Sequence, residues 1–190
     1  MRIEYINDEN GSFQEAHGSD GRLNVSSRSD ERMYYNSRDK SQTYSLVFDD
    51  ASCTSGDFNV ALCNDSTDGK HMVLHSIGVN ADAAVTMKLH LVTGTAGGGA
   101  VATLPLNLNR AGTSNAASAT ASTVVNSDSS PISGLTSAGV FDHAFLQAGG
   151  HEEFRIQDSI RLGQGQTVAI EADTATAGTR VAGVIFFYYE

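Results

Sequence analysis

Histidine side chains are the first residues of this sequence to test for chemistry. His71 and His75 have equal parity in an expected strand and so share a face, but the four residues of strand between them span roughly 13 Å. One metal ion cannot bridge that distance. His90 belongs to a later strand and could lie beside either, yet it has no neighbouring carboxylate or thiol ligand. We therefore expect ordinary surface histidines, no metal and no cofactor.

Four short motifs resemble known sites only in part. "GHEEF" at 150–154 lacks the second histidine and the helix of a zinc protease, and "NDSTDG" at 64–69 lacks the acidic spacing of a calcium loop. "GTAGGG" at 94–99 lacks the Lys-Ser or Lys-Thr pair of a phosphate loop, so we expect a mobile loop. "ISGLTSAG" at 132–139 contains Ser133 without a nucleophile elbow. These motifs predict no catalytic residue.

Acidic pairs leave one enzymatic alternative open. Glu152 with Asp158, or Asp142 with Glu171, could act as the two carboxylates of a glycosidase, since a fold can bring any two residues together. The chain has 22 acidic residues, so chance pairs are plentiful. We expect that the protein is not an enzyme, and we keep a small carbohydrate-active enzyme as an alternative.

Length and charge narrow the class of protein that must carry these residues. A chain of 190 residues that is 40% hydrophobic can bury the core of one domain. A net charge of −10 argues against binding nucleic acid, whose phosphates need a basic surface. No apolar stretch is long enough to span a membrane, and the first ten residues do not resemble a signal peptide. Cys53 and Cys63 are expected to be free thiols, as is usual after synthesis in the cytoplasm.

Alternating apolar residues predict strands over 43–190. Tyr44, Leu46 and Phe48 share one face of an extended run, and "AVTMKLHLVT" alternates in the same way. Asp68 and Gly69 give the strongest hairpin signal. Helical periodicity is absent, and glycine, serine and threonine are frequent between the runs. The expected fold is all-β, an antiparallel β-sandwich of jelly-roll type with a polar N-terminal arm over 1–42. A surface loop with a short strand or a helical turn is the alternative for that segment.

The last expected strand is apolar on both faces. In "GVIFFYYE", Val184, Phe186 and Tyr188 point one way, and the residues between them point the other way. Such a strand needs a second covering layer, for which we favour a neighbouring subunit. A simple central strand is the alternative.

The stretch "LPLNLNRAGTSNAASATAST" begins as a strand and continues as a tract of small residues. Leu104, Leu106 and Leu108 alternate with polar residues and Pro105, which is typical of a half-buried strand. Proline cannot donate to an inner ladder, so we expect an edge strand, with Arg110 pinning the chain as it leaves the sheet. Long structureless loops are uncommon in compact domains, so we expect another strand at 119–125.

The sequence resembles a group of tailed-bacteriophage virion proteins over roughly two thirds of the chain. The residues that carry the resemblance are the Asn-Asp turn in 58–69, the "LVTGTAGGGAVATLPLNLNR" passage at 91–110, the small-residue tract at 111–125 and "GHEEFRIQDSIRLGQGQTVAIEA" at 150–172. The passage at 107–110 is the most specific. The resemblance implies a β-sandwich subunit, without catalytic residues, that forms trimers as a head decoration protein or head fibre, or that belongs to the tail.

The expected partners are therefore the major capsid protein and two further copies of the chain, on the outer surface of the virion capsid after assembly in the host cytoplasm. A tail or baseplate component that binds a host glycan is the alternative. An arm needs charge-assisted pairs and aromatic bulk to offset its ordering entropy. The expected capsid contacts are Arg28, Arg32, Met33, Tyr34, Tyr35 and Arg38. The expected subunit interface contains Arg110, Val184, Phe186, Phe187, Tyr188 and Tyr189.

Overall fold

The structure is a computed structural model, and it describes residues 4–6, 13–15, 18–19, 22–23, 33, 42–53, 55–101, 104–109, 121–125, 131–173 and 178–190. The chain divides into two compact units, Met1–Glu31 and Arg32–Glu190. The first unit contains two short antiparallel hairpins, which pair β1 (Glu4–Ile6) with β2 (Phe13–Glu15) and β3 (Gly18–Ser19) with β4 (Arg22–Leu23).

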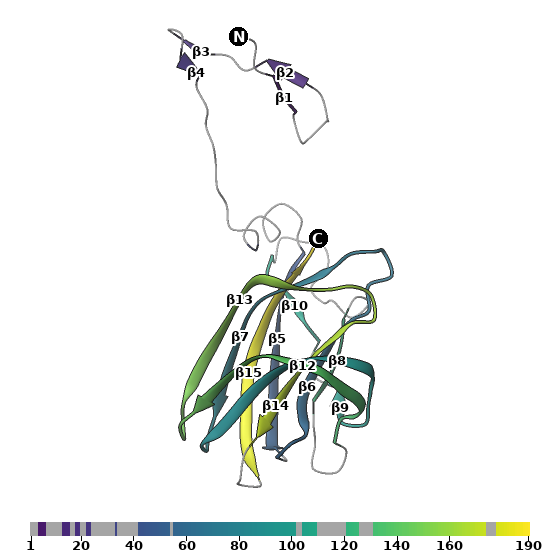
Figure 1. The fold of residues 1–190 in the computed structure, drawn as a ribbon, viewed down its shortest axis with the longest axis vertical. Helices are drawn as coiled ribbons and strands as arrows, with labels where there is room; N and C mark the ends of the chain where they lie inside the picture. Colours follow the sequence, from purple (N-terminus) through teal and green to yellow (C-terminus); the bar gives the residue numbers. More distant parts are fainter. Residues whose placement is uncertain are drawn as a thin grey trace. The chain divides into compact units, whose positions relative to one another are not determined.

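The second unit is an antiparallel sandwich of two sheets (Figure 1). Sheet 1 has the order β10 (Leu106–Asn107), β5 (Thr43–Cys53), β15 (Thr179–Tyr189), β7 (Met72–Ala81), β13 (His151–Leu162). Sheet 2 has the order β12 (Ser133–Leu146), β8 (Val85–Gly97), β14 (Thr167–Asp173), β6 (Phe58–Asn64), β11 (Ala121–Val125), β9 (Ala100–Val101). Strands β5-β15-β7-β13 of sheet 1 face β6-β14-β8-β12 of sheet 2, which is the strand order of a jelly roll. The predicted fold class is confirmed, and β11 lies within the strand expected at 119–125.

The core forms where alternating side chains of both sheets meet. Tyr44, Leu46 and Phe48 of β5 are all buried in it, as their spacing predicts. Val85, Met87 and Leu89 of β8 are buried in the same way, but the next residue of that parity, Leu91, is 37% exposed. Leu91 pairs with Val168 near the first residue of β14, so at this end β8 leaves the core. Alternation therefore predicts the inward face, but not where the core ends.

A bulge at His75 keeps β7 in the core along its whole length. Leu74 and Ile77 are both fully buried although they differ in parity. The consecutive residues Phe186 and Phe187 of β15 pair with Ser76 and Leu74, so His75 is an extra residue that restores the alternation. On its other side, His75 lies opposite residues 156–159 of β13, which also leave the ladder.

The β8–β12 pair bends sharply at two glycines that face each other. Gly94 and Gly134 have φ angles of +99° and +77°, and a Cβ atom on Gly94 would lie 2.1 Å from the Gly134 carbonyl oxygen. Only glycine fits both the left-handed conformation and the close approach. The mobile loop expected at 94–99 is therefore wrong for residues 94–97, because β8 continues to Gly97 opposite Ser133. Figure 1 shows the two strands curving together.

Buried polar side chains join the two sheets. Asn59 of β6 donates from Nδ2 to the Asp50 carboxylate of β5 at 2.9 Å and accepts from the Ala172 N–H of β14.

Asp68 and Gly69 do form a turn, with a Gly69 φ of +79°, but the expected hairpin is wrong. The turn connects β6 to β7, which lie in different sheets, because the chain alternates between the two sheets from β5 to β8.

Candidate functional site

The leucines in and beside the edge strand β10 face solvent. Leu104, Leu106 and Leu108 are 47%, 55% and 40% exposed, whereas Pro105 and Asn107 between them are buried. Leu106 pairs with Ser45, which lies on the outer face of sheet 1 between the buried Tyr44 and Leu46. The expected edge strand is confirmed and the alternation is present, but the apolar side chains point away from the core.

These leucines belong to a larger apolar surface on the outer face of sheet 1. In the neighbouring strands, Val47 is 59% exposed and pairs with the half-buried Val184, and Phe186 pairs with Ser45. We call this surface the sheet 1 patch; it comprises Val47, Leu104, Leu106, Leu108, Val184 and Phe186. Beyond the paired Val47 and Val184, the next pair along β5 and β15 is Asp49 and Ala182.

The charges at this rim neutralise each other. The Arg180 guanidinium binds the Asp49 carboxylate through two nitrogens, and the Nε–Oδ1 distance is 2.8 Å. This hydrogen bond lowers the pKa of Asp49, and the same bond raises the pKa of Arg180. The patch is therefore bordered by a compensated ion pair rather than by a single charge.

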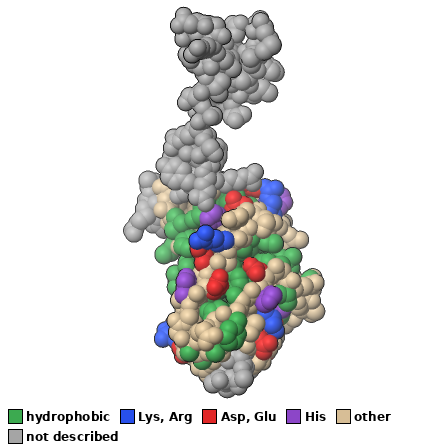
Figure 2. Space-filling model, turned by 60° about the vertical axis from the view of Figure 1, so that its left-hand side comes forward, with side chains coloured by type: hydrophobic (Ala, Val, Ile, Leu, Met, Phe, Trp, Pro, Cys, Tyr) green, Lys and Arg blue, Asp and Glu red, His purple; other side chains and the backbone are tan. Residues whose placement is uncertain are grey.

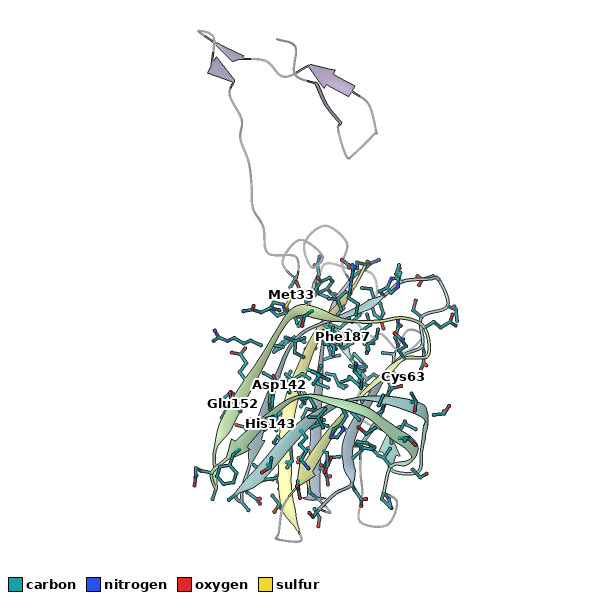
Figure 3. All side chains as sticks on the ribbon, in the orientation of Figure 1. Met33, Cys63, Asp142, His143, Glu152 and Phe187 are labelled. Carbon is teal, nitrogen blue, oxygen red and sulfur yellow. The ribbon has the colours of Figure 1, made fainter. Side chains whose placement is uncertain are left out.

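The predicted interface residues of β15 divide between its two faces. Phe187 and Tyr189 lie in the core, where Phe187 stacks on Tyr44 at a centroid distance of 5.6 Å. Figure 3 shows Phe187 among the side chains between the sheets. As interface residues these two are wrong, because β15 is a central strand of sheet 1 and its odd-numbered residues face the core. Tyr188 points the other way but is also fully buried within the chain. Val184 and Phe186 remain accessible, and for them the interface stays a prediction.

The predicted capsid contacts are described only at Met33. This residue is half-buried, and its carbonyl oxygen accepts a hydrogen bond of 3.0 Å from the Thr43 hydroxyl at the start of β5. The other expected contacts, together with the interface residue Arg110, lie outside the described residues: Arg28, Arg32, Tyr34, Tyr35 and Arg38.

The outer face of sheet 2 carries a connected polar network. Ser137 Oγ lies 2.8 Å from His90 Nδ1, and Glu171 Oε2 lies 2.8 Å from His90 Nε2. Lys88 Nζ lies 3.2 Å from the second Glu171 oxygen and 3.0 Å from Asp173, which also accepts from the Ser55 hydroxyl. We call these residues the sheet 2 network: Ser55, Lys88, His90, Ser137, Glu171 and Asp173.

Electrostatics within the sheet 2 network favour the charged forms of its outer members. Hydrogen bonds to Asp173 and then to Glu171 raise the pKa of Lys88. Hydrogen bonds from Lys88 and then from Ser55 lower the pKa of Asp173. Lys88 therefore stays protonated between two carboxylates.

His90 is the buried centre of the network. Its side chain is 6% exposed, and the edge of Phe58 packs against it with a ring-centroid distance of 5.3 Å. The Glu171 carboxylate is close to Nε2 but out of line for a hydrogen bond, so the contact is electrostatic. His90 lies in sheet 2, whereas His71 precedes β7 and His75 lies on β7 in sheet 1.

This network could not be predicted from the sequence, because the network depends on strand register. The available signal was the equal parity of Lys88 and His90 in one strand and of Glu171 and Asp173 in another. Only the antiparallel pairing of β8 with β14 brings the two sets together.

Of the two carboxylate pairs kept open for a glycosidase, Glu152 and Asp158 do not converge. Glu152 lies opposite Val79 and Asp158 lies opposite His75, about 13 Å along β7, and Asp158 contacts His75 at 3.2 Å. Glu171 is engaged by the sheet 2 network. No group of three or more metal-ligating side chains occurs within the described part of the chain.

Cys53 does not have the lowered pKa of an activated thiolate. Burial, followed by the charge of Asp50, raises the pKa of the Cys53 thiol. Cys63 lines a cavity of about 260 Å³ between the outer face of sheet 2 and residues 94–96 of the bent β8 strand. Figure 3 shows Cys63 on the other side of the sandwich from Asp142, His143 and Glu152, so these groups cannot form one site.

On the face drawn in Figure 2, acidic, basic and apolar side chains are interspersed, without a large region of one sign. In the described part of the chain, no helix has the length and apolarity needed to cross a membrane. Comparison with family models, with curated proteins and with solved structures gives no match.

Proposed function

We propose that this protein is a structural subunit of a tailed-bacteriophage virion, a capsid decoration or head-fibre protein that binds the outer surface of the head, forms homotrimers and needs no catalysis for this role. The observation that carries the proposal is the sheet 1 patch, an apolar sheet face that the single chain leaves exposed. The sequence resemblance supplies the virion context. The jelly-roll strand order is compatible with it, since capsid proteins use this fold, but lectin domains use it too.

Burial of the sheet 1 patch is the driving force that the proposal assigns to assembly. Complete burial of a valine, leucine or phenylalanine side chain contributes about 1.5–3 kcal/mol relative to full exposure. Val47, Leu104, Leu106 and Leu108 are only about half exposed, so each would contribute a part of this. Together, these partial burial free energies would still stabilise an interface.

Charge explains why the contact would form at this face. Copies with a net charge of −10 repel one another, so an interface requires a surface on which no uncompensated charge is buried. The sheet 1 patch meets this condition, because its border charges, Asp49 and Arg180, are already paired. A closed ring of identical copies is the usual form of such assembly.

The first experiment is the native mass by light scattering after size-exclusion chromatography. Three copies of the 20.0 kDa chain give about 60 kDa. Leu106→Asp should yield monomers that keep the wild-type circular dichroism spectrum, because Leu106 is exposed in the single chain. The matched control is Val140→Asp, at a site of 50% exposure on the edge strand β12, and it should remain a trimer. A monomeric wild-type protein would contradict the assembly.

The second experiment tests the virion context. Purified protein is mixed with phage heads that lack it, and bound protein is measured after sedimentation. We expect the full chain to bind and a variant that lacks residues 1–40 to stay in the supernatant. Binding of the truncated variant would contradict the assignment of the arm as the capsid anchor.

A further inference from the structure

Ser137, His90 and Glu171 follow the order of groups that activates a hydroxyl nucleophile. The Ser137 hydroxyl lies 2.8 Å from His90 Nδ1, and the opposite ring nitrogen lies 2.8 Å from Glu171 Oε2. A serine within hydrogen-bond reach of a histidine that a third group orients is the geometric signature of nucleophilic catalysis. Contacts that are poorly aligned in the absence of substrate, such as that of Nε2, do not exclude the role.

The base is held in place from several strands. Phe58 of β6 packs its edge on the ring, and Glu171 of β14 is fixed on its other oxygen by Lys88 of β8. The carboxylate thus stays beside Nε2, the nitrogen that must carry the N–H for Nδ1 to accept the serine proton, and it would stabilise the imidazolium ion that forms. Because the His90 side chain is only 6% exposed, water competes little for this position.

The backbone next to Ser137 provides the second requirement. The register of β12 against β8 shifts between Ser137 and Gly139, so Ala138 is a bulge residue without a partner in β8. The N–H of the residue after a nucleophile is a common donor to the oxyanion of acyl transfer. Ser137 and Ala138 are exposed, and apart from the adjacent residues no heavy atom lies within 4 Å of the Cβ position of Gly139, so the surface beside Ser137 is open.

We propose that Ser137 is a nucleophilic serine that accepts acyl groups from small esters, with His90 as general base and Glu171 as its positioning residue. Ser137 Oγ attacks the ester carbonyl carbon while His90 Nδ1 takes the hydroxyl proton. The bond to the leaving alkoxide or phenolate then breaks, and His90 returns the proton to it. Water releases the acyl group from Ser137 in the reverse manner. This site lies on sheet 2 and does not involve the sheet 1 patch.

The experiment uses the full-length protein and p-nitrophenyl acetate. We expect release of p-nitrophenolate together with acetylation of Ser137, located by peptide mass spectrometry. Ser133 is the internal control, since it is an exposed serine of the same strand whose hydroxyl bonds only the Gly97 carbonyl in the described contacts. General-base catalysis should make Ser137 react about 100-fold faster than Ser133. Equal rates at the two serines would overturn the proposal.

Variants separate activation from mere exposure. Ser137→Ala should abolish the acetylated peptide, and Ser133→Ala should not. His90→Gln should lower the Ser137 rate to that of Ser133, and Glu171→Gln should lower it with a changed pH profile. Since His90 is buried, each variant is first compared with wild type by circular dichroism, and Glu171→Gln decides the matter if His90→Gln is unfolded. An unchanged Ser137 rate in folded Glu171→Gln would remove Glu171 from the proposal. The native mass is measured in parallel, so failure here leaves the assembly test unaffected.

Discussion

The outer faces of the two sheets differ in the side chains that they present. On sheet 1, Val47 and the three leucines of the β10 region remain open to solvent, and the bordering Asp49 is neutralised by Arg180. On sheet 2, the bent end of β8 approaches the outer face and encloses a cavity, and the centre is occupied by the sheet 2 network.

This contrast indicates which of the two faces leaves apolar side chains in contact with water. On sheet 2 the charges of Lys88, Glu171 and Asp173 are compensated within the chain. A face of exposed aliphatic side chains leaves apolar area in water, and a large contiguous patch of this kind marks a contact site. We therefore propose that assembly uses sheet 1 and that polar chemistry takes place on sheet 2.

The largest expected effect comes from breaking the bend on sheet 2. Gly94→Val places a β-branched side chain at φ +99° and against the Gly134 carbonyl. Backbone strain and overpacking together should lower the free energy of unfolding by about 4 kcal/mol. Urea denaturation measures it. Gly139→Ala in the partner strand is the control, and it should change stability little, because space at Gly139 is open. Equal effects of the two would show that the bend is not constrained.

Two adjacent residues of β5 lie on opposite faces of sheet 1. Leu46 is fully buried and Val47 is 59% exposed. Leu46→Ala should cost about 3 kcal/mol through lost burial and the remaining cavity, whereas Val47→Thr, which keeps the β-branched shape, should stay within about 0.5 kcal/mol. Both are measured by thermal and urea unfolding at a concentration at which the protein is monomeric. A large loss in Val47→Thr would mean that the patch already supports the single chain.

Alternating side chains made most of the fold predictable. The period-2 runs around Leu46 and Met87 identify strands and inward residues, and Pro105 correctly indicates an edge. Alternation alone does not identify the inward face of a strand when neither of its two alternating sets of residues is charged. The strand around Leu106 is such a case. It also does not show that the turn at Gly69 leads into the other sheet, since that depends on topology rather than on local conformation.

The candidate sites were less predictable because they arise from pairing between distant strands. His90, Ser137 and Glu171 are far apart in sequence, and they meet only through the register of β8 with β12 and β14. The register shift that leaves Ala138 without a partner in β8 is a property of that pairing. In contrast, the apolar residues Val184 and Phe186 can be identified from the sequence, because their strand is apolar on both faces.

The relative position of the two faces depends on the link between Asp50, Asn59 and Ala172. Asn59→Ala removes a hydrogen bond to a buried carboxylate and leaves the Ala172 N–H without its acceptor. We expect a loss of about 2 kcal/mol in unfolding free energy. Asn80→Ala serves as the comparison, since the Asn80 contact with His151 is exposed, and it should lie within about 0.5 kcal/mol of wild type. If Asn59→Ala were as mild, the sheets would be held by apolar packing alone at this end.

The smallest expected effect concerns acid pH at the sheet 2 network. The folded state lowers the pKa of Asp173 below its ordinary value of 3.8, mainly through the hydrogen bond from Lys88. An acid whose pKa is lowered by folding contributes stability above its unfolded pKa, and the contribution disappears as the pH falls through the folded pKa. Carboxyl NMR titration should therefore find Asp173 below 3.8 in the wild-type protein and closer to 3.8 in Lys88→Met. Asp49, whose pKa is lowered by Arg180 on the other sheet, is the reference group and should titrate alike in both proteins. An unchanged Asp173 titration in Lys88→Met would show that Lys88 does not hold the network, and would leave Glu171 beside His90 without its fixed partner.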